Sequence, residues 1–214
     1  MTEEFVAVFL NNLDRLSNAF FTHLQIAFTA VAFGAMIAVP LGILLARMPR
    51  SGKKIIAVLS IFQTVPSMVM FGLLLPLSGL GRTTAVIVLT LYSLLPILRN
   101  TYTGISEVSQ GYLEAARGMG MNNRQILFQV EVPISLPVIV AGIRLSSVYV
   151  ISWTTLAAIV GAGGLGDIII IGLFQNNRPL LLLGAISTSI LAIVTSYVTG
   201  KIARAVTPRG LRKN

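Results

Sequence analysis

Charged residues and cysteine are scarce in this sequence. Only 11% of its 214 residues are charged, 55% are hydrophobic, and cysteine is absent. A soluble domain usually carries about 25% charged residues. Long apolar stretches at this low charge density indicate an integral membrane protein. The absence of cysteine excludes disulfides and thiolate metal sites.

Histidine is almost equally scarce. His23 is the single histidine, and a protein metal site normally needs several clustered ligands. We therefore expect no metal, and we interpret His23 as a polar residue near the start of a helix. The sequence also contains no G-x4-G-K-[ST] phosphate loop, so we expect the chain not to bind ATP in that manner.

Acidic residues are outnumbered, seven against sixteen basic ones, which gives a net charge of +9. An excess of positive charge can indicate nucleic-acid binding. Here the basic residues flank apolar runs, as expected for loops that face anionic lipid. We therefore predict contact with membrane lipid and no nucleic-acid partner.

Five apolar stretches approach or exceed the roughly 20 residues that a helix needs to cross a bilayer. They run roughly over residues 21–46, 55–77, 84–103, 134–160 and 180–202. The stretch before them, residues 1–16, begins acidic and lacks the basic n-region of a signal peptide, so we expect a short amphipathic segment there. The sequence predicts an all-α, multi-pass membrane protein whose single domain covers residues 1–214.

Basic residues gather after the first, third and fifth apolar stretches, whereas the opposite segments hold only Arg15, Arg82 and Arg178. Those after the first and fifth stretches are Arg47, Arg50, Lys53, Lys54, Lys201, Arg204, Arg209, Arg212 and Lys213. Cytoplasmic loops of membrane proteins carry an excess of Lys and Arg. We therefore expect the N-terminus outside and the C-terminus in the cytoplasm.

Small residues recur every four positions in the first apolar stretch. They are Ala30, Gly34, Ala38 and Gly42. This spacing lies along one helical face, and small side chains let helix backbones approach closely in lipid. We interpret the face as a helix-packing surface. Pro40 should kink this helix, and Pro66, Pro76 and Pro96 should bend the next two.

A polar segment, roughly residues 106–133, interrupts the apolar sequence. Ser109 and Asn122 are good helix N-caps. Gly118 and Gly120 can end the first helix, since glycine tolerates the left-handed turn found there. The pattern predicts two short helices before Pro133 and the fourth stretch. Residue chemistry alone leaves two interpretations open, an amphipathic interfacial loop or a docking element for a soluble partner.

The spacing inside this segment favours docking. It reads Glu114-Ala115-Ala116, three residues that include Arg117 and Gly118, Gly120, nine residues, and then Val130-Glu131-Val132-Pro133. This resembles the E-A-A-x3-G-x9-I-x-L-P signature of importer-type ABC permeases, with Val130 for Ile and Val132 for Leu. The resemblance implies that Glu114, Ala115, Ala116, Arg117, Gly118, Gly120 and Pro133 couple the chain to an ATPase.

The resemblance covers nearly the whole chain. Five spans with this loop before the fourth look like the methionine-importer type, and "VGAGGLGD", residues 160–167, is similar to a stretch of the methionine and osmoprotectant permeases. "FQTVPSMVMFGLLLPLSGLG" and "LYSLLPILRNTYTGI" resemble the osmoprotectant branch. The resemblance implies import of a compatible solute such as glycine betaine, carnitine or choline, with an amino acid such as methionine as the alternative.

The resemblance also implies partners. Two separate ATPase subunits would use ATP and magnesium, and this chain would bind no cofactor and have no catalytic residue. A second permease chain, identical or paralogous, would complete the pathway, and an extracytoplasmic binding protein would deliver the solute. The complex would lie in the bacterial cytoplasmic membrane.

Aromatic residues within the spans are the candidates for contact with the solute. A quaternary ammonium is attracted to the face of an aromatic ring, and the spans contain Tyr92, Tyr149 and Trp153. Ordinary packing of these rings is the other interpretation. Two other classes of protein fit the sequence less well. Gly164 to Asp167 matches the G-x-G-D pattern of intramembrane aspartyl proteases, but such a site needs two aspartates and the only other one is Asp14. A passive channel would explain the apolar stretches but not the E-A-A spacing.

Overall fold

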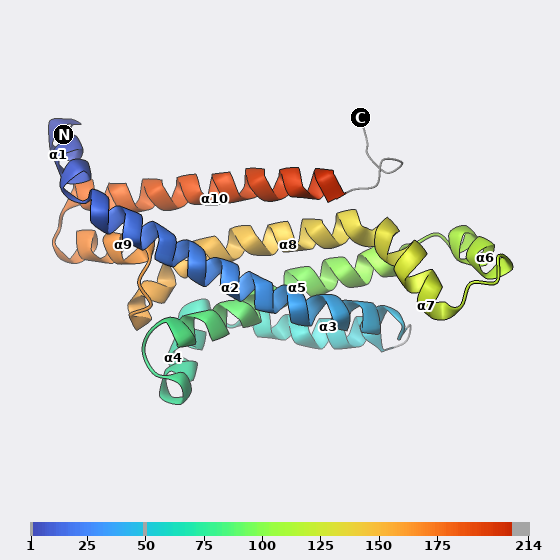
Figure 1. Ribbon diagram of the computed structural model, residues 1–214. Coiled ribbons are helices and arrows are strands. Elements are labelled where there is room, and N and C mark those ends of the chain that lie inside the picture. The colour runs from blue at the N-terminus through green and yellow to red at the C-terminus, as the bar shows by residue number, and fades with distance from the viewer. Residues whose placement is uncertain (1, 49–50, 207–214) are drawn as a thin grey trace.

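The computed structural model describes residues 2–48 and 51–206, and all its regular elements in those ranges are helical (Figure 1). Four helical stretches are long and apolar enough to cross a membrane, namely α2 (Leu13–Ala46), α5 (Arg82–Ser106), Asn123–Thr154 and α10 (Arg178–Val206). The third comprises α7 (Asn123–Ile126), a π-helical turn (Leu127–Glu131) and α8 (Val132–Thr154). The all-α, multi-pass architecture expected from the sequence is confirmed.

The shorter helices lie at the ends and on one side of these four. They are α1 (Thr2–Asn11), α3 (Gly52–Ile61), α4 (Ser67–Ser78), α6 (Gln110–Gly118), α9 (Leu165–Phe174) and two 3₁₀ helices, Phe62–Thr64 and Leu156–Val160. The basic residues Arg50, Arg209, Arg212 and Lys213 lie outside the described residues.

The apolar stretch 55–77 is not one straight helix. The helices Gly52–Thr64 and Ser67–Ser78 meet at 89°, and counted together they make a fifth candidate span. Pro66 lies at the break and Val65 before it is extended, because a residue preceding proline is disfavoured in the α conformation. The bend expected at Pro66 is confirmed. Pro40 and Pro96 lie inside α2 and α5.

The four long helices lie side by side, with α2, α5 and α10 running in one direction and α8 in the other (Figure 1). Helix α5 packs against α2, α8 and α4, while α10 packs against α8 and α9. Helices α6 and α7 project at one end of the bundle, and α1 and α9 lie at the opposite end (Figure 1). The chain therefore presents the polar segment beyond the ends of the spans.

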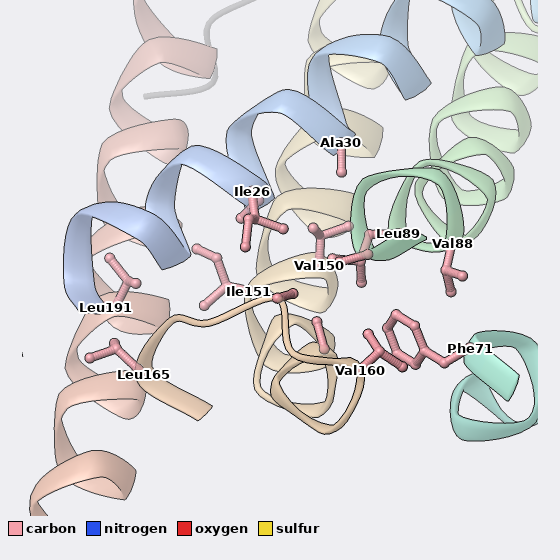
Figure 2. Close-up of a cluster of buried hydrophobic side chains, with 14 of the residues drawn as sticks. Ile26, Ala30, Phe71, Val88, Leu89, Val150, Ile151, Val160, Leu165 and Leu191 are labelled. Atoms are coloured by element: carbon pink, nitrogen blue, oxygen red, sulfur yellow. The ribbon is translucent and has the colours of Figure 1, made fainter. Parts of the chain in front are cut away.

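Two clusters of buried apolar side chains hold the spans together. The larger one, near α9, brings Ile26 of α2, Leu89 of α5 and Ile151 of α8 together with side chains of α4, α9 and α10 (Figure 2). The smaller one includes Ala38 and Leu45 of α2 and residues of α3 and α5. Many large apolar side chains on the outer faces are exposed, as expected where lipid replaces water.

The small residues of α2 face α5. Ala30 and Ala38 are fully buried, and Gly34 and Gly42 are buried as well. The hydroxyl of Ser93 on α5 donates a hydrogen bond of 3.3 Å to the carbonyl of Ala30. The two backbones therefore come close enough for a side chain of one helix to bond to the main chain of the other.

Candidate coupling segment and translocation cavity

The polar segment begins with α6, which ends in a turn that requires glycine. Gly120 has a φ of +81°, a left-handed conformation that side chains with a Cβ adopt only at a cost of about 1–2 kcal/mol. The N–H of Met121 bonds to the carbonyl of Ala116 at 3.1 Å, and that of Gly120 to the carbonyl of Arg117 at 2.9 Å. This pair of bonds is a Schellman motif, and it turns the chain sharply toward α7.

Helix α7 begins at Asn122, as the sequence predicts. The Asn122 side chain accepts hydrogen bonds from the N–H groups of Arg124 and Gln125, and the Gln125 side chain accepts one from the N–H of Asn122. Ser109 does occupy the cap position before α6, but the predicted cap bond is wrong, because its side chain forms none. Instead the Ser109 carbonyl accepts the bond from the N–H of Tyr112.

The segment has its own small hydrophobic core. Val108, Leu113, Ala116 and Ile126 are buried together, and Val130 and Ile134 pack against them. Ala116 of the Glu-Ala-Ala triplet is 1% exposed and therefore belongs to this core. The core holds α6 and α7 in one arrangement, so the segment presents a defined outer surface.

That outer surface mixes charge with large apolar side chains. Glu114, Ala115, Arg117, Gly118 and Gly120 are exposed. Tyr112, Met119 and Phe128 are also exposed, at 58%, 74% and 66%. No ion pair joins Glu114 to Arg117 in the part of the chain that the structure describes, so both charges remain available to a partner. Pro133 lies in the first turn of α8 and is partly buried.

The three aromatic candidates of the spans meet although they come from two helices. The ring centroids of Tyr92 and Trp153 lie 5.0 Å apart, and those of Tyr149 and Trp153 lie 5.5 Å apart. Tyr92 is buried and donates its hydroxyl to the carbonyl of Val65 at the break between α3 and α4. Tyr149 is 43% exposed, so one end of this aromatic cluster is accessible.

A cavity of about 260 Å³ lies beside this cluster, where the α3–α4 break faces α5. Tyr92 contributes to its wall. The other lining residues are Leu41, Leu59, Phe62, Gln63, Met70, Leu91, Leu94, Leu95 and Leu98. The side-chain amide of Gln63 reaches the carbonyl of Tyr92 at 3.5 Å. The wall carries no charged side chain, so the cavity suits a group that is neutral or is bound by aromatic faces.

The structure also gives His23 a role that the sequence did not predict. His23 is fully buried rather than at a helix entrance. Its Nδ1 accepts the N–H of Leu165 at 3.3 Å, so its Nε2 carries the proton and donates it to the carbonyl of Ile151 at 3.0 Å. His23 thus joins α2 to α8 and to the start of α9.

One ion pair joins the polar segment to the spans. Arg47, directly after α2, donates to the carboxylate of Glu131, the last residue of the π-helical turn. Sequence reasoning treated the two residues separately, as a loop cation and as part of the polar segment. The signal that could have found the pair is an acidic residue placed between Val130 and Val132, where a carboxylate needs a partner.

Residues 38–210 match the model of the family described as the binding-protein-dependent transport system inner membrane component. The chain belongs to this family, whose members are permease subunits of ABC importers in the inner membrane. Such a subunit works with an ATPase, which uses ATP, and with a substrate-binding protein. The family assignment replaces the two weaker alternatives, an aspartyl protease and a passive channel.

Curated relatives match over almost the whole chain. The carnitine transport permease OpuCB of Listeria monocytogenes is 46% identical over 208 residues, which cover 97% of this chain and 95% of that protein. The glycine betaine/carnitine/choline permease OpuCB of Bacillus subtilis is 45% identical over 190 residues, 89% and 88% of the two chains. These relatives support the osmoprotectant branch of the family.

A solved structure shares the fold. An inward-facing form of the methionine ABC transporter MetNI matches with a TM-score of 0.82 and 25% sequence identity, covering 92% of this chain and 99% of that chain. The resemblance to importer-type permeases stated from the Glu-Ala-Ala spacing is therefore confirmed.

Proposed function

We propose that this chain is half of the membrane pathway of an ATP-driven importer for a compatible solute such as glycine betaine, carnitine or choline. The relatives named above support this substrate class. The uncharged cavity wall also supports it, since these solutes carry a quaternary ammonium that needs no anionic partner when aromatic faces are present.

The proposal depends on the polar segment, residues 106–133, which we call the coupling segment from here on. A compact pair of helices, held by a Schellman motif and a capping box, exposes Glu114 and Arg117 beside Tyr112, Met119 and Phe128. Exposed aromatic and Met side chains around a few charges are typical of a docking surface. This surface inserts into a groove on the ATPase, and residues 106–133 therefore face the cytoplasm, with the N-terminus outside and the C-terminus inside.

Energy comes from the partner rather than from this chain. Two ATPase subunits bind ATP and magnesium and close on each other, and the two permease chains then rock between inward-open and outward-open states. Both series of relatives, OpuCB at 45% and OpuCD at 43% identity, resemble this chain. They support a second permease that is a paralogue, with an identical copy as the alternative. The chain itself contributes no catalytic residue and binds no cofactor.

The aromatic cluster is the proposed contact for the solute. Tyr92 of α5 lines the cavity, and Trp153 and Tyr149 of α8 extend from Tyr92 in a series of ring contacts. A methylated ammonium against such faces gains about 0.5–2 kcal/mol. That is enough to position a solute during passage without holding it in the pathway.

An amino acid such as methionine is the second candidate, favoured by the likeness to the methionine transporter fold. Uptake separates the two. Cells without other compatible-solute importers, supplied with this chain and its partners, should accumulate labelled glycine betaine, carnitine or choline at high osmolarity. Uptake of labelled methionine with none of these three solutes would assign the chain to the alternative. An ATPase variant that cannot hydrolyse ATP is the control for ATP-driven uptake.

A further inference from the structure

The ion pair between Arg47 and Glu131 joins two parts of the chain that are 84 residues apart. It is the only side-chain salt bridge among residues 5–48 and 51–206, whose side chains the structure describes. The Glu131 side chain is 7% exposed and the Arg47 side chain 39% exposed. A buried carboxylate is unfavourable unless it is paired, so Glu131 holds the end of α2 to the coupling segment.

The acidic end of this pair is directly connected to the docking surface. Glu131 ends the π-helical turn Leu127–Glu131, which also carries the exposed Phe128. Val130 packs against the small core of the coupling segment. Any displacement of the docking surface therefore moves Glu131, since only a few covalent and packing contacts separate them. Single π-helical turns frequently occur at functional sites.

The basic end of the pair lies beyond a weak point in α2. Pro40 lies inside α2 and lacks the N–H that would bond to the carbonyl of Met36. Two turns later the helix ends and Arg47 follows. Leu41, directly after the proline, lines the cavity of about 260 Å³. A pull on Arg47 therefore acts on a segment that can bend at Pro40 and that forms part of the cavity wall.

We propose that the Arg47–Glu131 ion pair transmits movement of the coupling segment to the adjacent end of α2 and, through Leu41, to the cavity. This inference rests on the proposed function, because it requires an ATPase that moves the segment. Arg47 and Glu131 act as positioning residues, and neither touches the solute or the nucleotide. Their loss should uncouple ATP hydrolysis from transport rather than prevent assembly.

The test uses the complete complex in proteoliposomes, with its ATPase, second permease and binding protein. Glu131→Gln and Arg47→Gln should retain the ATPase but lower the solute transported per ATP hydrolysed by about 5- to 10-fold, within the usual range of coupling between sites. Glu107→Gln is the matched control, because it removes an exposed carboxylate near the start of the same segment, before α6. It should leave the ratio unchanged.

A double variant separates tethering from folding. The chain has no cysteine, so Arg47→Cys with Glu131→Cys provides the only two thiols of this chain for a short bifunctional thiol cross-linker. The ratio of solute transported to ATP hydrolysed is measured in one preparation of this double variant before and after cross-linking. Cross-linking should raise the ratio toward the wild-type value. A ratio that stays normal in the single variants, or that the cross-link leaves low, would overturn the inference.

Arg47→Lys keeps the positive charge and should retain most of the coupling. If the single variants lose ATPase association instead, and their remaining complexes have a normal ratio, the pair is only structural and the inference fails. Failure of the proposed function is distinguishable, because then the wild-type complex itself transports no compatible solute.

Discussion

Gly34 of α2 lies so close to Ser93 of α5 that a Cβ on Gly34 would stand 1.8 Å from the Ser93 hydroxyl oxygen. Gly42 repeats this two turns later, where a Cβ would lie 2.7 Å from the Cβ of Thr101. Without a hydrophobic driving force between helices in lipid, such close packing is a main source of association. The contact between α2 and α5 therefore depends on these two glycines.

Replacing Gly34 should separate the two helices. Gly34→Leu forces α2 away from Ser93, and overpacking of this kind costs about 1–3 kcal/mol. Thermal unfolding of the purified complex in detergent measures the loss. Gly72→Leu is the control, since a Cβ at Gly72 of α4 meets nothing within 4 Å. Equal melting temperatures for both variants would contradict the packing argument.

The coupling segment should fail when its turn is altered. Gly120→Val opposes the left-handed φ of +81° and removes the sharp turn between α6 and α7. We expect the chain to insert in the membrane but to lose ATPase co-purification and solute uptake, and Glu114→Ala to show a milder loss. Gly111→Ala in α6, the helix before this turn, is the control, because a Cβ there meets only the Ser109 hydroxyl at 3.8 Å. Normal uptake with Gly120→Val would reduce the segment to an interfacial loop.

Removing an aromatic face should weaken use of a cationic solute. Trp153→Leu keeps an apolar side chain but removes the ring that contacts both Tyr92 and Tyr149. A loss of about 0.5–2 kcal/mol corresponds to a rise in the apparent KM for glycine betaine or choline of about 2- to 30-fold. Trp153→Phe, which keeps an aromatic ring, should raise the apparent KM less. A packing role alone would instead lower the amount of inserted chain without changing KM.

His23 should be needed for stability. His23→Ala leaves the N–H of Leu165 and the carbonyl of Ile151 without a partner, and each buried unpaired group costs about 1–3 kcal/mol. The melting temperature of the complex should fall. Phe28→Ala, on the same helix but 73% exposed, is the control and should change it little. A stable His23→Ala variant would mean that water replaces the imidazole.

Thiol labelling in intact cells checks the orientation. Single cysteines at Ser51 and Asn122 should be protected from an impermeant reagent, and one at Gln175 should react. All three positions are exposed. We choose Gln175 and not its neighbour Asn176, because Asn176 has a φ of 49°, a left-handed conformation that a cysteine there would adopt less readily. The reverse labelling pattern would place the coupling segment outside and exclude its contact with an ATPase.

Local chemistry explains which features could be predicted from the sequence. Asn122 caps α7 through bonds to residues two and three positions away. The break at Pro66 follows from the missing N–H and from the restriction on Val65. The membrane-spanning stretches could likewise be predicted, because their length and apolar composition alone identify them. Ser109 failed as a cap because its own backbone carbonyl, rather than its hydroxyl, bonds to the N–H of Tyr112.

Contacts between distant segments could not be predicted in this way. His23 bonds to residues 128 and 142 positions along the chain. Glu131 meets Arg47 only because α2 and the π-helical turn end at the same level. The three aromatic residues were selected for their chemistry, whereas their contact depends on how α5 packs against α8.

The separate core of the coupling segment has an evolutionary consequence. Val108, Leu113, Ala116 and Ile126 are packed with one another and belong to neither of the two clusters between the spans. Substitutions on the outer surface of the segment therefore need no compensating change in the spans. We therefore expect that changes of the exposed side chains can alter which ATPase the segment binds without repacking the two clusters between the spans.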